Sequence, residues 1–463
     1  MIAWFVNIAI IALGVYILKD IRKGFCAALC ARILFPEVTR FQAFGVNLAI
    51  YDILIAFLGL SFLWSLYKRE FSDFKGKKPS GLIFFIIFYY LSSCVLIFFS
   101  ADLIPQEEQF KCFFKTAFQE TFYLIVGYYA LRDADRKFFF NLLIAVACVA
   151  GLYGIYAYMT SSNPYVMSII SSFSVDSNYD EFLTEARGAL KSRTSGTLAH
   201  PLTWGQLWGL LFAFYAVLSQ TDQKPLWFNI AFSGLALINI LLCGSRTALI
   251  SAIVFGIFFF FSRESVTRFK ILAAAFIFLM GVLALPINDS KYPVVTYMKS
   301  AIFFWDDSYS RSAGINGSNA DMRLEQLDEV VTILEMFPMG GLGYNSTTIF
   351  ADHPLFDRMR GFESVAFRKT LEQGWLGFLC FLISFAGFAI WSIRNTSTGK
   401  EKLFMAGYFA SYMASILVTG IQSTWFVFLL LPLLYSSGKN EEIELIEEDL
   451  EGSKDAEELD DQD

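Results

Sequence analysis

The chain of 463 residues is 56% hydrophobic and only 17% charged, and Phe alone supplies 51 residues. This composition offers too little polar surface for a soluble domain of such length, and it excludes a typical cytosolic enzyme. Repeated apolar runs of about 20 residues instead indicate an all-α bundle that crosses a membrane many times. The net charge of −7 comes partly from the acidic stretch 441–463, which we expect to be a solvated, disordered tail.

Twelve apolar runs have the length and composition of membrane-spanning helices. The first run has no basic segment before it and no small-residue cleavage site, so we expect a retained span rather than a signal peptide. A further apolar stretch, 24–35, is short and predicts either a thirteenth span or a re-entrant or interfacial piece. The predicted spans are 2–18, 46–66, 81–101, 114–131, 138–159, 203–219, 226–243, 247–262, 271–287, 374–392, 403–419 and 423–436.

Loop charges predict the orientation, because Lys and Arg are retained on the cytoplasmic side of short loops. Five loops on one side together carry 15 Lys and Arg, whereas the short loops on the other side are poor in them. The sidedness of the N-terminus depends on whether 24–35 spans. The cytoplasmic loops are 68–80, 132–137, 220–225, 263–270 and 393–402, and the external ones are 102–113, 160–202, 244–246 and 288–373.

Four regions follow from these spans. A membrane bundle, 1–287, contains the external loop 160–202, and a second long external loop fills 288–373. The C-terminal spans, 374–436, precede the cytoplasmic tail, 437–463. Seven scattered cysteines and two histidines have no metal-ligand spacing, so we predict no metal and no cofactor, and we expect membrane lipids but no nucleic acid as partners.

The second long loop contains an expected helix that Asn319 or Asp321 caps and that ends near Pro338. At helical spacing, its apolar residues share one face, and Arg323 falls within that apolar arc. If the helix lies along the outer membrane surface, Arg323 either reaches the lipid headgroups or binds an anion in a cavity below. The apolar residues of this face are Leu324, Leu327, Val330, Val331 and Leu334.

Four arginines, Arg187, Arg193, Arg246 and Arg323, are all predicted on the external side, where short loops normally avoid Arg. Arg246 follows a Gly-Ser pair between two apolar runs, so it is either a topological residue at the interface or a guanidinium at the mouth of the bundle. An anionic ligand in the outer leaflet is the simplest reason for the set, because the planar guanidinium binds phosphate through two hydrogen bonds. A lipid-linked pyrophosphate meets this requirement.

In the segment 361–377, Glu363 and Ser364 are followed by nine residues, then Gly374, two further residues and Gly377. A carboxylate is therefore expected where the bundle meets water. The two glycines, three apart on one helical face, predict close helix packing at the top of the last long span.

Taken in order, these motifs resemble those of the bacterial O-antigen ligase and O-antigen polymerase superfamily. The resemblance rests on Arg-Thr-Ser-Gly-Thr (193–197), Gly-Ser-Arg-Thr-Ala (244–248), the long loop with its Arg-bearing helix, Gly-Gly-Leu-Gly-Tyr-Asn (340–345) and the motif at Glu363. In the ligases, the last motif begins with His. Glu363 occupies that place here, which favours a polymerase or a related exopolysaccharide enzyme.

The resemblance implies a glycosyltransferase at the periplasmic face of the bacterial inner membrane. An undecaprenyl-pyrophosphate-linked oligosaccharide is the donor, and a second lipid-linked unit is the acceptor. Arg193, Arg246 and Arg323, assisted by Arg187, hold the pyrophosphate. Glu363 accepts the hydroxyl proton, orients the sugar, or forms a structural ion pair.

Two more residues, His200 and Tyr344, complete the expected substrate-binding set, although Tyr344 also fits an interfacial anchor. A chain-length regulator and a flippase are the expected protein partners. Three alternatives stay open: a ligase that transfers the glycan to lipid A core, a transporter or flippase of lipid-linked glycans, and a membrane scaffold without catalysis. The transporter is disfavoured because charge is inferred at the outer face and the mid-span segments are almost uncharged.

Overall fold

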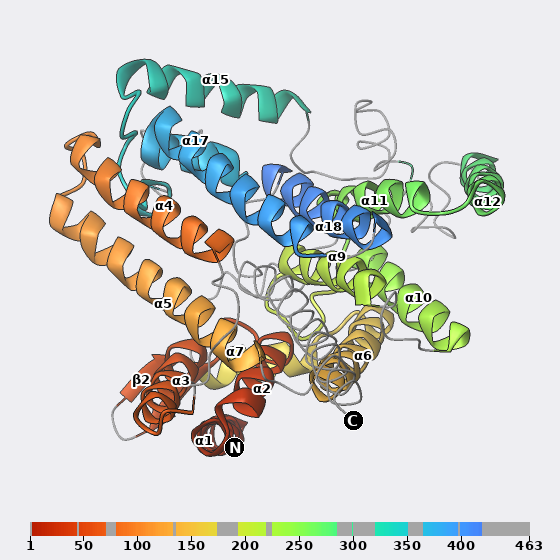
Figure 1. Cartoon of the computed structure of the whole chain (residues 1–463), viewed down its shortest axis with the longest axis horizontal. Helices are drawn as coiled ribbons and strands as arrows, with labels where there is room; N and C mark the ends of the chain where they lie inside the picture. Colours follow the sequence, from red (N-terminus) through yellow and green to blue (C-terminus); the bar gives the residue numbers. More distant parts are fainter. Residues whose placement is uncertain are drawn as a thin grey trace, which may run out of the picture.

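The computed structural model is a bundle of helices with one short antiparallel hairpin (Figure 1). Within the described ranges, four helices are long and apolar enough to cross a membrane: Ile50–Tyr67, Gly81–Phe99, Phe138–Thr160 and Val365–Arg394. The predicted class, a helical membrane protein, is confirmed, whereas the count of twelve spans stays a prediction. The structure describes residues 2–43, 46–70, 80–132, 136–173, 193–218, 225–284, 299, 320–350, 364–396 and 399–418.

Two helices separated by one residue begin the chain, α1 (Ile2–Lys19) and α2 (Ile21–Leu34). Asp20 caps α2, because its Oδ1 accepts a hydrogen bond from the backbone N–H of Arg22 at 3.0 Å. With 14 residues, α2 is about 21 Å long, shorter than the hydrocarbon core of about 30 Å. It packs against α1, α5 and α6. The stretch 24–35 is therefore a short buried helix rather than a full span.

A two-stranded hairpin follows, in which β1 (Arg40–Ala43) pairs with β2 (Val46–Ala49). The buried side chain of Asn7 extends this ladder, since its Nδ2 donates to the carbonyl of Gln42 at 2.8 Å and its Oδ1 accepts from the N–H of Gln42 at 3.2 Å. The predicted span 46–66 is thus wrong in its first four residues, which pair as a strand.

The next helices form one side of the bundle. The predicted span 114–131 is part of a longer helix, α5, whose first turn carries Glu107 and Glu108 near the positive end of the helix dipole. The predicted external loop 160–202 contains a helix that we did not predict, α7, whose apolar face is buried. These elements are α3 (Ile50–Tyr67), α4 (Ser80–Leu96), the 3₁₀ turn η1 (Ile97–Phe99), α5 (Gln106–Arg132), α6 (Arg136–Thr160) and α7 (Pro164–Phe173).

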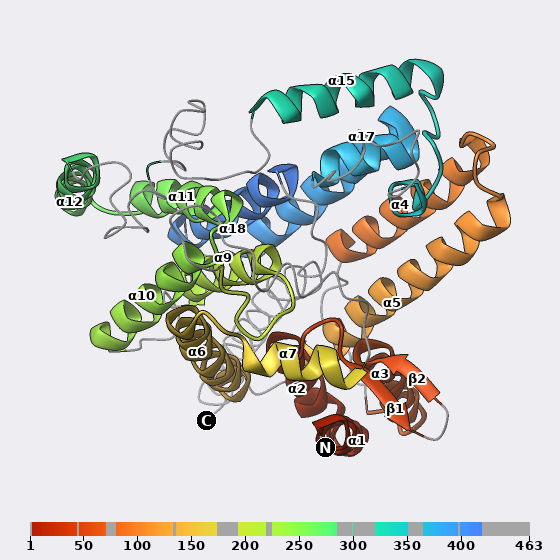
Figure 2. The ribbon, with the colours of Figure 1, turned by 180° about the vertical axis from the view of Figure 1, so that it is seen from behind.

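A second group of helices lies beside the first, and both views show α9, α11 and α18 together (Figures 1 and 2). Small polar residues join them: Ser251 Oγ lies 2.7 Å from Ser411 Oγ, and Gln206 Nε2 donates to Ser415 Oγ at 2.9 Å. The members are α9 (Pro201–Leu218), α10 (Leu226–Leu242), α11 (Arg246–Phe261), α12 (Ser265–Ala284) and α18 (Gly399–Val418).

The remaining helices lie in the second long loop predicted from the sequence, 288–373, or begin within it. They are α15 (Ala320–Met336), α16 (Ser346–Ile349) and α17 (Val365–Arg394). In Figure 2, α15 lies along the first part of α17 at the edge of the molecule. As predicted, α15 ends just before Pro338. However, α17 begins nine residues before the predicted span 374–392, and it packs along α4 and α18.

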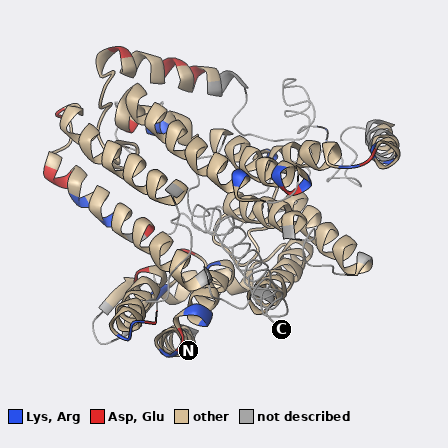
Figure 3. Ribbon diagram, in the orientation of Figure 1, with Lys and Arg blue, Asp and Glu red and all other residues tan. Residues whose placement is uncertain are grey.

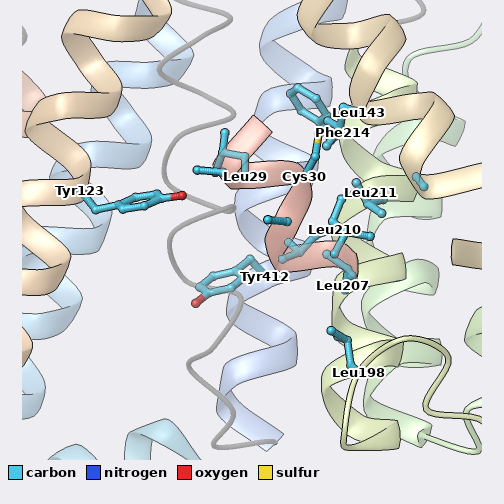
Figure 4. Close-up of a cluster of buried hydrophobic side chains, with 14 of the residues drawn as sticks. Leu29, Cys30, Tyr123, Leu143, Leu198, Leu207, Leu210, Leu211, Phe214 and Tyr412 are labelled. Carbon is cyan, nitrogen blue, oxygen red and sulfur yellow. The ribbon is translucent and has the colours of Figure 1, made fainter. Parts of the chain in front are cut away.

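A close-packed core joins α2, α5, α6, α9 and α18 (Figure 4). Trp204 and Trp208 of α9 are fully buried there, and Tyr123 and Tyr412 approach it from opposite helices. In contrast, large apolar side chains cover the outside, such as Trp4 at 72% exposure. An apolar core with an equally apolar exterior is what a bundle surrounded by lipid requires.

Candidate functional site

The turn between α10 and α11 is held by an arginine from the preceding long loop, which is predicted to be external. Arg193 is 3% exposed, and its Nε donates to the carbonyl of Cys243 at 3.0 Å. Next to it, the N–H of Thr194 donates to the carbonyl of Leu242 at 3.1 Å. The structure therefore brings the end of the predicted external segment 160–202 into contact with Leu242 and Cys243, directly before the predicted external segment 244–246.

The segment that begins at Arg193 is fixed by further polar contacts. Thr194 Oγ1 donates to the carbonyl of Gly154 on α6 at 2.9 Å. Asn163 Nδ2 donates to Ser195 Oγ at 2.9 Å and to the carbonyl of Gly196 at 2.8 Å. Because Gly196 has φ +54°, the turn needs a residue without a side chain. The Arg-Thr-Ser-Gly-Thr motif is thus a rigid, buried connection.

Arg246 is the first residue of α11. Gly244 (φ +63°) lets the chain turn tightly, and Ser245 caps the helix by accepting from the N–H of Ala248 at 3.5 Å. The N-terminal N–H groups and the helix dipole favour an anion at this end. Arg246 is half-buried, so its guanidinium lies beside a helix end that already attracts negative charge.

Arg323 lies in the second turn of α15, and only its place on the helix is described. On a helical wheel it falls between Val330 and Leu334, which are 2% and 3% exposed. The orientation predicted for Arg323 stays a prediction, because only its backbone position is described. The composition of the buried arc differs from the prediction, because Gln326 and Ile333 are buried as well.

Three apolar residues assigned to the same face, Leu324, Leu327 and Val331, are exposed instead. Around the circumference of the helix, these three residues lie between the buried residues and the acidic residues. The apolar surface of α15 is therefore wider than one packing face: part of it meets the protein and part is uncovered. Acidic side chains occupy the rest of α15 (Figure 3).

Of the other predicted site residues, Arg187 and Glu363 lie outside the described residues. His200 is half-buried just before α9, where its Nδ1 accepts from the N–H of Leu202 at 3.1 Å. This contact makes His200 a cap of α9. Ser364, next to Glu363, caps α17 by accepting from the N–H of Phe367 at 3.4 Å.

The glycine motif of the long loop interlocks with a break in α17. Gly374 has φ +68° and ψ −172°, so α17 is interrupted there and the N–H of Trp375 donates to the carbonyl of Pro338 at 3.1 Å. The carbonyl of Leu371 accepts from the N–H of Leu342 at 2.7 Å. Our interpretation of Gly374 and Gly377 as one continuous packing face is therefore wrong. The helix is interrupted at Gly374, where the backbone of the long loop at Pro338 crosses α17.

Tyr344 follows this crossing and lies inside the protein. Its N–H donates to Gln109 Oε1 at 2.9 Å, which joins the long loop to the predicted external segment 102–113. Its ring meets Phe113 edge to face, with centroids 5.5 Å apart. Burial raises the pKa of the Tyr344 phenol above its usual range, so the hydroxyl stays protonated and can donate a hydrogen bond.

Charged residues that we did not predict as site members surround Tyr344. Glu120 of α5 accepts a hydrogen bond from the Tyr90 hydroxyl at 2.6 Å, and Lys369 of α17 is 4% exposed. Arg368, directly before Lys369, contacts Glu372 one turn further along α17, with Nε and Oε1 3.1 Å apart. A carboxylate inside the predicted span 114–131 was the available signal, because ionisable groups in apolar spans are rarely structural accidents.

Metal-ligand chemistry has no evident place in this cluster. Across the part of the chain that the structure describes, no group of three or more His, Cys, Asp and Glu residues could hold a metal ion. The site is instead composed of arginines, one lysine, carboxylates and tyrosines. Such groups bind anions and hydroxyl-bearing ligands through charge and hydrogen bonds.

Comparison with known protein families finds a match over part of the chain. Residues 231–382 match the family model of the O-antigen ligases, a segment that runs from α10 into α17 and includes Arg246, Arg323 and Glu363. No curated protein matches the chain. The match confirms the resemblance to the O-antigen ligase and O-antigen polymerase superfamily, whose members are glycan-transferring membrane enzymes.

Proposed function

We propose that the protein is a polysaccharide polymerase that joins undecaprenyl-pyrophosphate-linked repeat units at the periplasmic face of the bacterial inner membrane. The observation that carries this proposal is the joint placement of Arg193 and Arg246 at one turn: Arg193 bonds to Cys243, three residues before Arg246. Two guanidinium-bearing residues at one helix end suit a diphosphate, whose charge grows as the lipid leaves.

The arginines bind the donor and stabilise its leaving group in this proposal. The acceptor hydroxyl attacks the anomeric carbon, the bond from that carbon to the phosphate oxygen breaks, and undecaprenyl pyrophosphate departs. Arg193 and Arg246 hold its phosphates, and Arg323 and Arg187 add charge from the two long loops. Because Arg193 is buried and bonded to the backbone, its guanidinium loses little conformational entropy when it binds the ligand.

Glu363 accepts the proton of the attacking hydroxyl. Its place beside Ser364, the cap of α17, puts it at the start of the helix that carries Lys369 and Glu372. An unperturbed Glu has a pKa of about 4.3, so a base of this kind needs an environment that strengthens it. Orientation of the sugar by hydrogen bonds is the competing role for the same carboxylate.

Reconstitution decides between polymerase and ligase. Purified protein in liposomes receives lipid-linked repeat units alone, and the products are separated by size. Ladders of long chains are expected from the wild type, and Arg246→Ala should abolish them while Arg394→Ala, at the exposed end of α17, should not. Elongation that appears only after core lipid is added would make the protein a ligase and refute the proposal.

A transporter is the second candidate, favoured by two features. α17 is interrupted at Gly374, and Glu120 lies within the predicted apolar span 114–131. Interrupted helices and intramembrane carboxylates are typical of transporters. The same liposomes test this function: if Arg246→Ala and Arg323→Ala leave elongation intact and block translocation of lipid-linked units, transport replaces transfer as the assigned activity.

A further inference from the structure

A small polar cavity lies between α4, α5, α17, α18 and the long loop, apart from the arginine turn. Its volume is about 10 Å³, roughly the room that one water-sized group needs. Most of the bundle interior is apolar, yet this cavity is lined by ionisable and hydroxyl-bearing side chains. They include Tyr89, Thr116, Glu120, Tyr344, Lys369 and Tyr412.

Lys369 is the unusual member of this set. The residue is 4% exposed, and its ammonium has neither a hydrogen bond nor an ion pair with any residue among those described. Its Nζ lies 5.2 Å from the ring centroid of Tyr89 and 5.7 Å from that of Tyr344. These rings stabilise the cation through their faces but accept none of its three N–H bonds. Among the described residues, the ammonium therefore has no hydrogen-bond acceptor, and a buried cation is stabilised by one.

Glu120 offers the complementary chemistry on the same cavity. One of its oxygens accepts from the Tyr90 hydroxyl at 2.6 Å, which leaves further acceptor capacity on the carboxylate. A group that enters the cavity thus meets a donor, Lys369, and an acceptor, Glu120. An alcohol satisfies both, since its oxygen accepts and its hydrogen donates. A phosphate is attracted by Lys369 and repelled by Glu120, so it fits less well.

The cavity is close to the proposed donor site through α18. Tyr412 lines the cavity, and the preceding residue, Ser411, contacts Ser251 on α11. Ser251 lies five residues after Arg246, about 7.5 Å along the helix axis. Helix α18 therefore connects the cavity with α11, the helix that begins at Arg246.

We propose that this cavity is an acceptor subsite that receives one hydroxyl group of a saccharide, held between the Lys369 ammonium and the Glu120 carboxylate. Tyr344 and Tyr89 form its aromatic walls, and the long loop closes it through the contact of Tyr344 with Gln109. This assignment rests on the proposed function, because it presupposes a saccharide acceptor. The assignment adds to the proposed function a place for acceptor recognition, on α5 and α17, apart from the arginines that bind the donor.

Binding of a soluble saccharide isolates this subsite from the donor site. The probe is the oligosaccharide released by mild acid from lipid-linked repeat units of the cells that make the protein, since it keeps the hydroxyls and loses the pyrophosphate. Calorimetry on detergent-solubilised protein should show affinity at least about tenfold weaker for Lys369→Met and for Glu120→Gln, as expected when a buried polar partner is lost. The matched controls on exposed parts of α5, Lys115→Met and Glu108→Gln, should bind like the wild type.

Inorganic pyrophosphate separates the two sites. It should bind Lys369→Met as tightly as the wild type and bind Arg246→Ala more weakly, and it should not displace the oligosaccharide. Displacement, or unchanged oligosaccharide affinity in both Lys369→Met and Glu120→Gln, overturns the subsite. Thr116→Val is a nearly isosteric third variant at the cavity, and it carries the test if either charge variant loses a cooperative thermal transition.

Elongation by the wild type keeps the two proposals distinguishable. If liposomes make no polymer from lipid-linked units, the proposed polymerase function fails whatever the binding data show. If they do make polymer and the cavity variants bind the oligosaccharide normally, only the subsite fails.

Discussion

Arg193 Nε and the carbonyl oxygen of Cys243 lie 3.0 Å apart, although 50 positions separate the two residues in the chain. This bond ties the end of the predicted external loop 160–202 to the turn that starts α11. The position of Arg246 is therefore coupled to that of Arg193, since both depend on the same short stretch of backbone. A donor-binding site built on these arginines is held together by one side chain that serves both the fold and the ligand.

Replacing Arg193 by Lys should damage stability as well as donor binding. Lys keeps the charge but lacks the planar guanidinium that donates to Cys243. Loss of a buried hydrogen bond from a charged group is expected to lower the free energy of unfolding by about 1–3 kcal/mol. Thermal unfolding in detergent measures this effect, and Arg394→Lys, on the exposed end of α17, serves as the control. Equal melting temperatures for the two variants would contradict the proposed coupling.

The break at Gly374 predicts a large effect of one added methyl group. Its φ and ψ lie in a region that essentially only Gly adopts, and a Cβ there would come within 2.4 Å of the carbonyl oxygen of Pro338. Gly374→Ala should therefore destabilise the protein by about 1–3 kcal/mol and reduce elongation.

The matched control is Gly256→Ala in α11. A Cβ at Gly256 meets no atom within 4 Å, so this substitution should be neutral or stabilise the helix by about 0.5–1 kcal/mol. If the two alanine variants unfold at the same temperature, α17 runs through Gly374 without the described crossing.

Two apolar residues of α15 should respond differently to truncation. Ile333 is 3% exposed and packs with Leu342 and Leu371, whereas Leu324 is 63% exposed. Ile333→Ala should weaken the docking of α15 by about 2–4 kcal/mol, and limited proteolysis within the long loop should become faster. Leu324→Ala should leave the cleavage rate close to that of the wild type. Faster cleavage of the Leu324 variant would show that α15 packs through its other face.

Helix positions were predictable where a hydrophobic run alone determines them. The predicted span 138–159 differs from α6 by two residues at its start and one at its end, and 226–243 nearly coincides with α10. The strand Val46–Ala49 was missed, because a short stretch with three apolar residues directly before a helix looks like its continuation. What distinguishes them is pairing with β1, and β1 is itself held by hydrogen bonds between Gln42 and Asn7, which lies 35 positions away in the chain.

The candidate site was predictable in its residue types and less so in its geometry. Unusual external arginines drew attention to Arg193 and Arg246, and the structure brings their segments together. The Lys369 cavity was not predicted, because Lys369 and Glu120 are distant in sequence and each looks like an isolated charge. Gly374 was assigned to packing, since a left-handed backbone depends on the tertiary contact with Pro338 and has no sequence signature of its own.

The ion pair between Arg368 and Glu372 should contribute measurable coupling energy. Arg368 Nε lies 3.1 Å from Glu372 Oε1, and the Glu372 side chain is only 4% exposed. Arg368 Nη2 also donates to Thr348 Oγ1 at 3.1 Å, so the pair fastens α16 to the start of α17. Removing one partner leaves a largely buried charge without its counterpart, which is far costlier than removing both.

A double-mutant cycle with Arg368→Met and Glu372→Gln measures this energy. Each single variant should lose about 1–3 kcal/mol of stability, and the double variant should lose less than their sum, with a coupling energy of about 1 kcal/mol or more. The exposed pair Lys23–Asp20, at 3.9 Å, provides the comparison: Lys23→Met should cost less than about 0.5 kcal/mol. Additive losses at Arg368 and Glu372 would show that the two side chains act independently, and that the start of α17 is held by other contacts, such as its backbone bonds with Leu342 and Pro338.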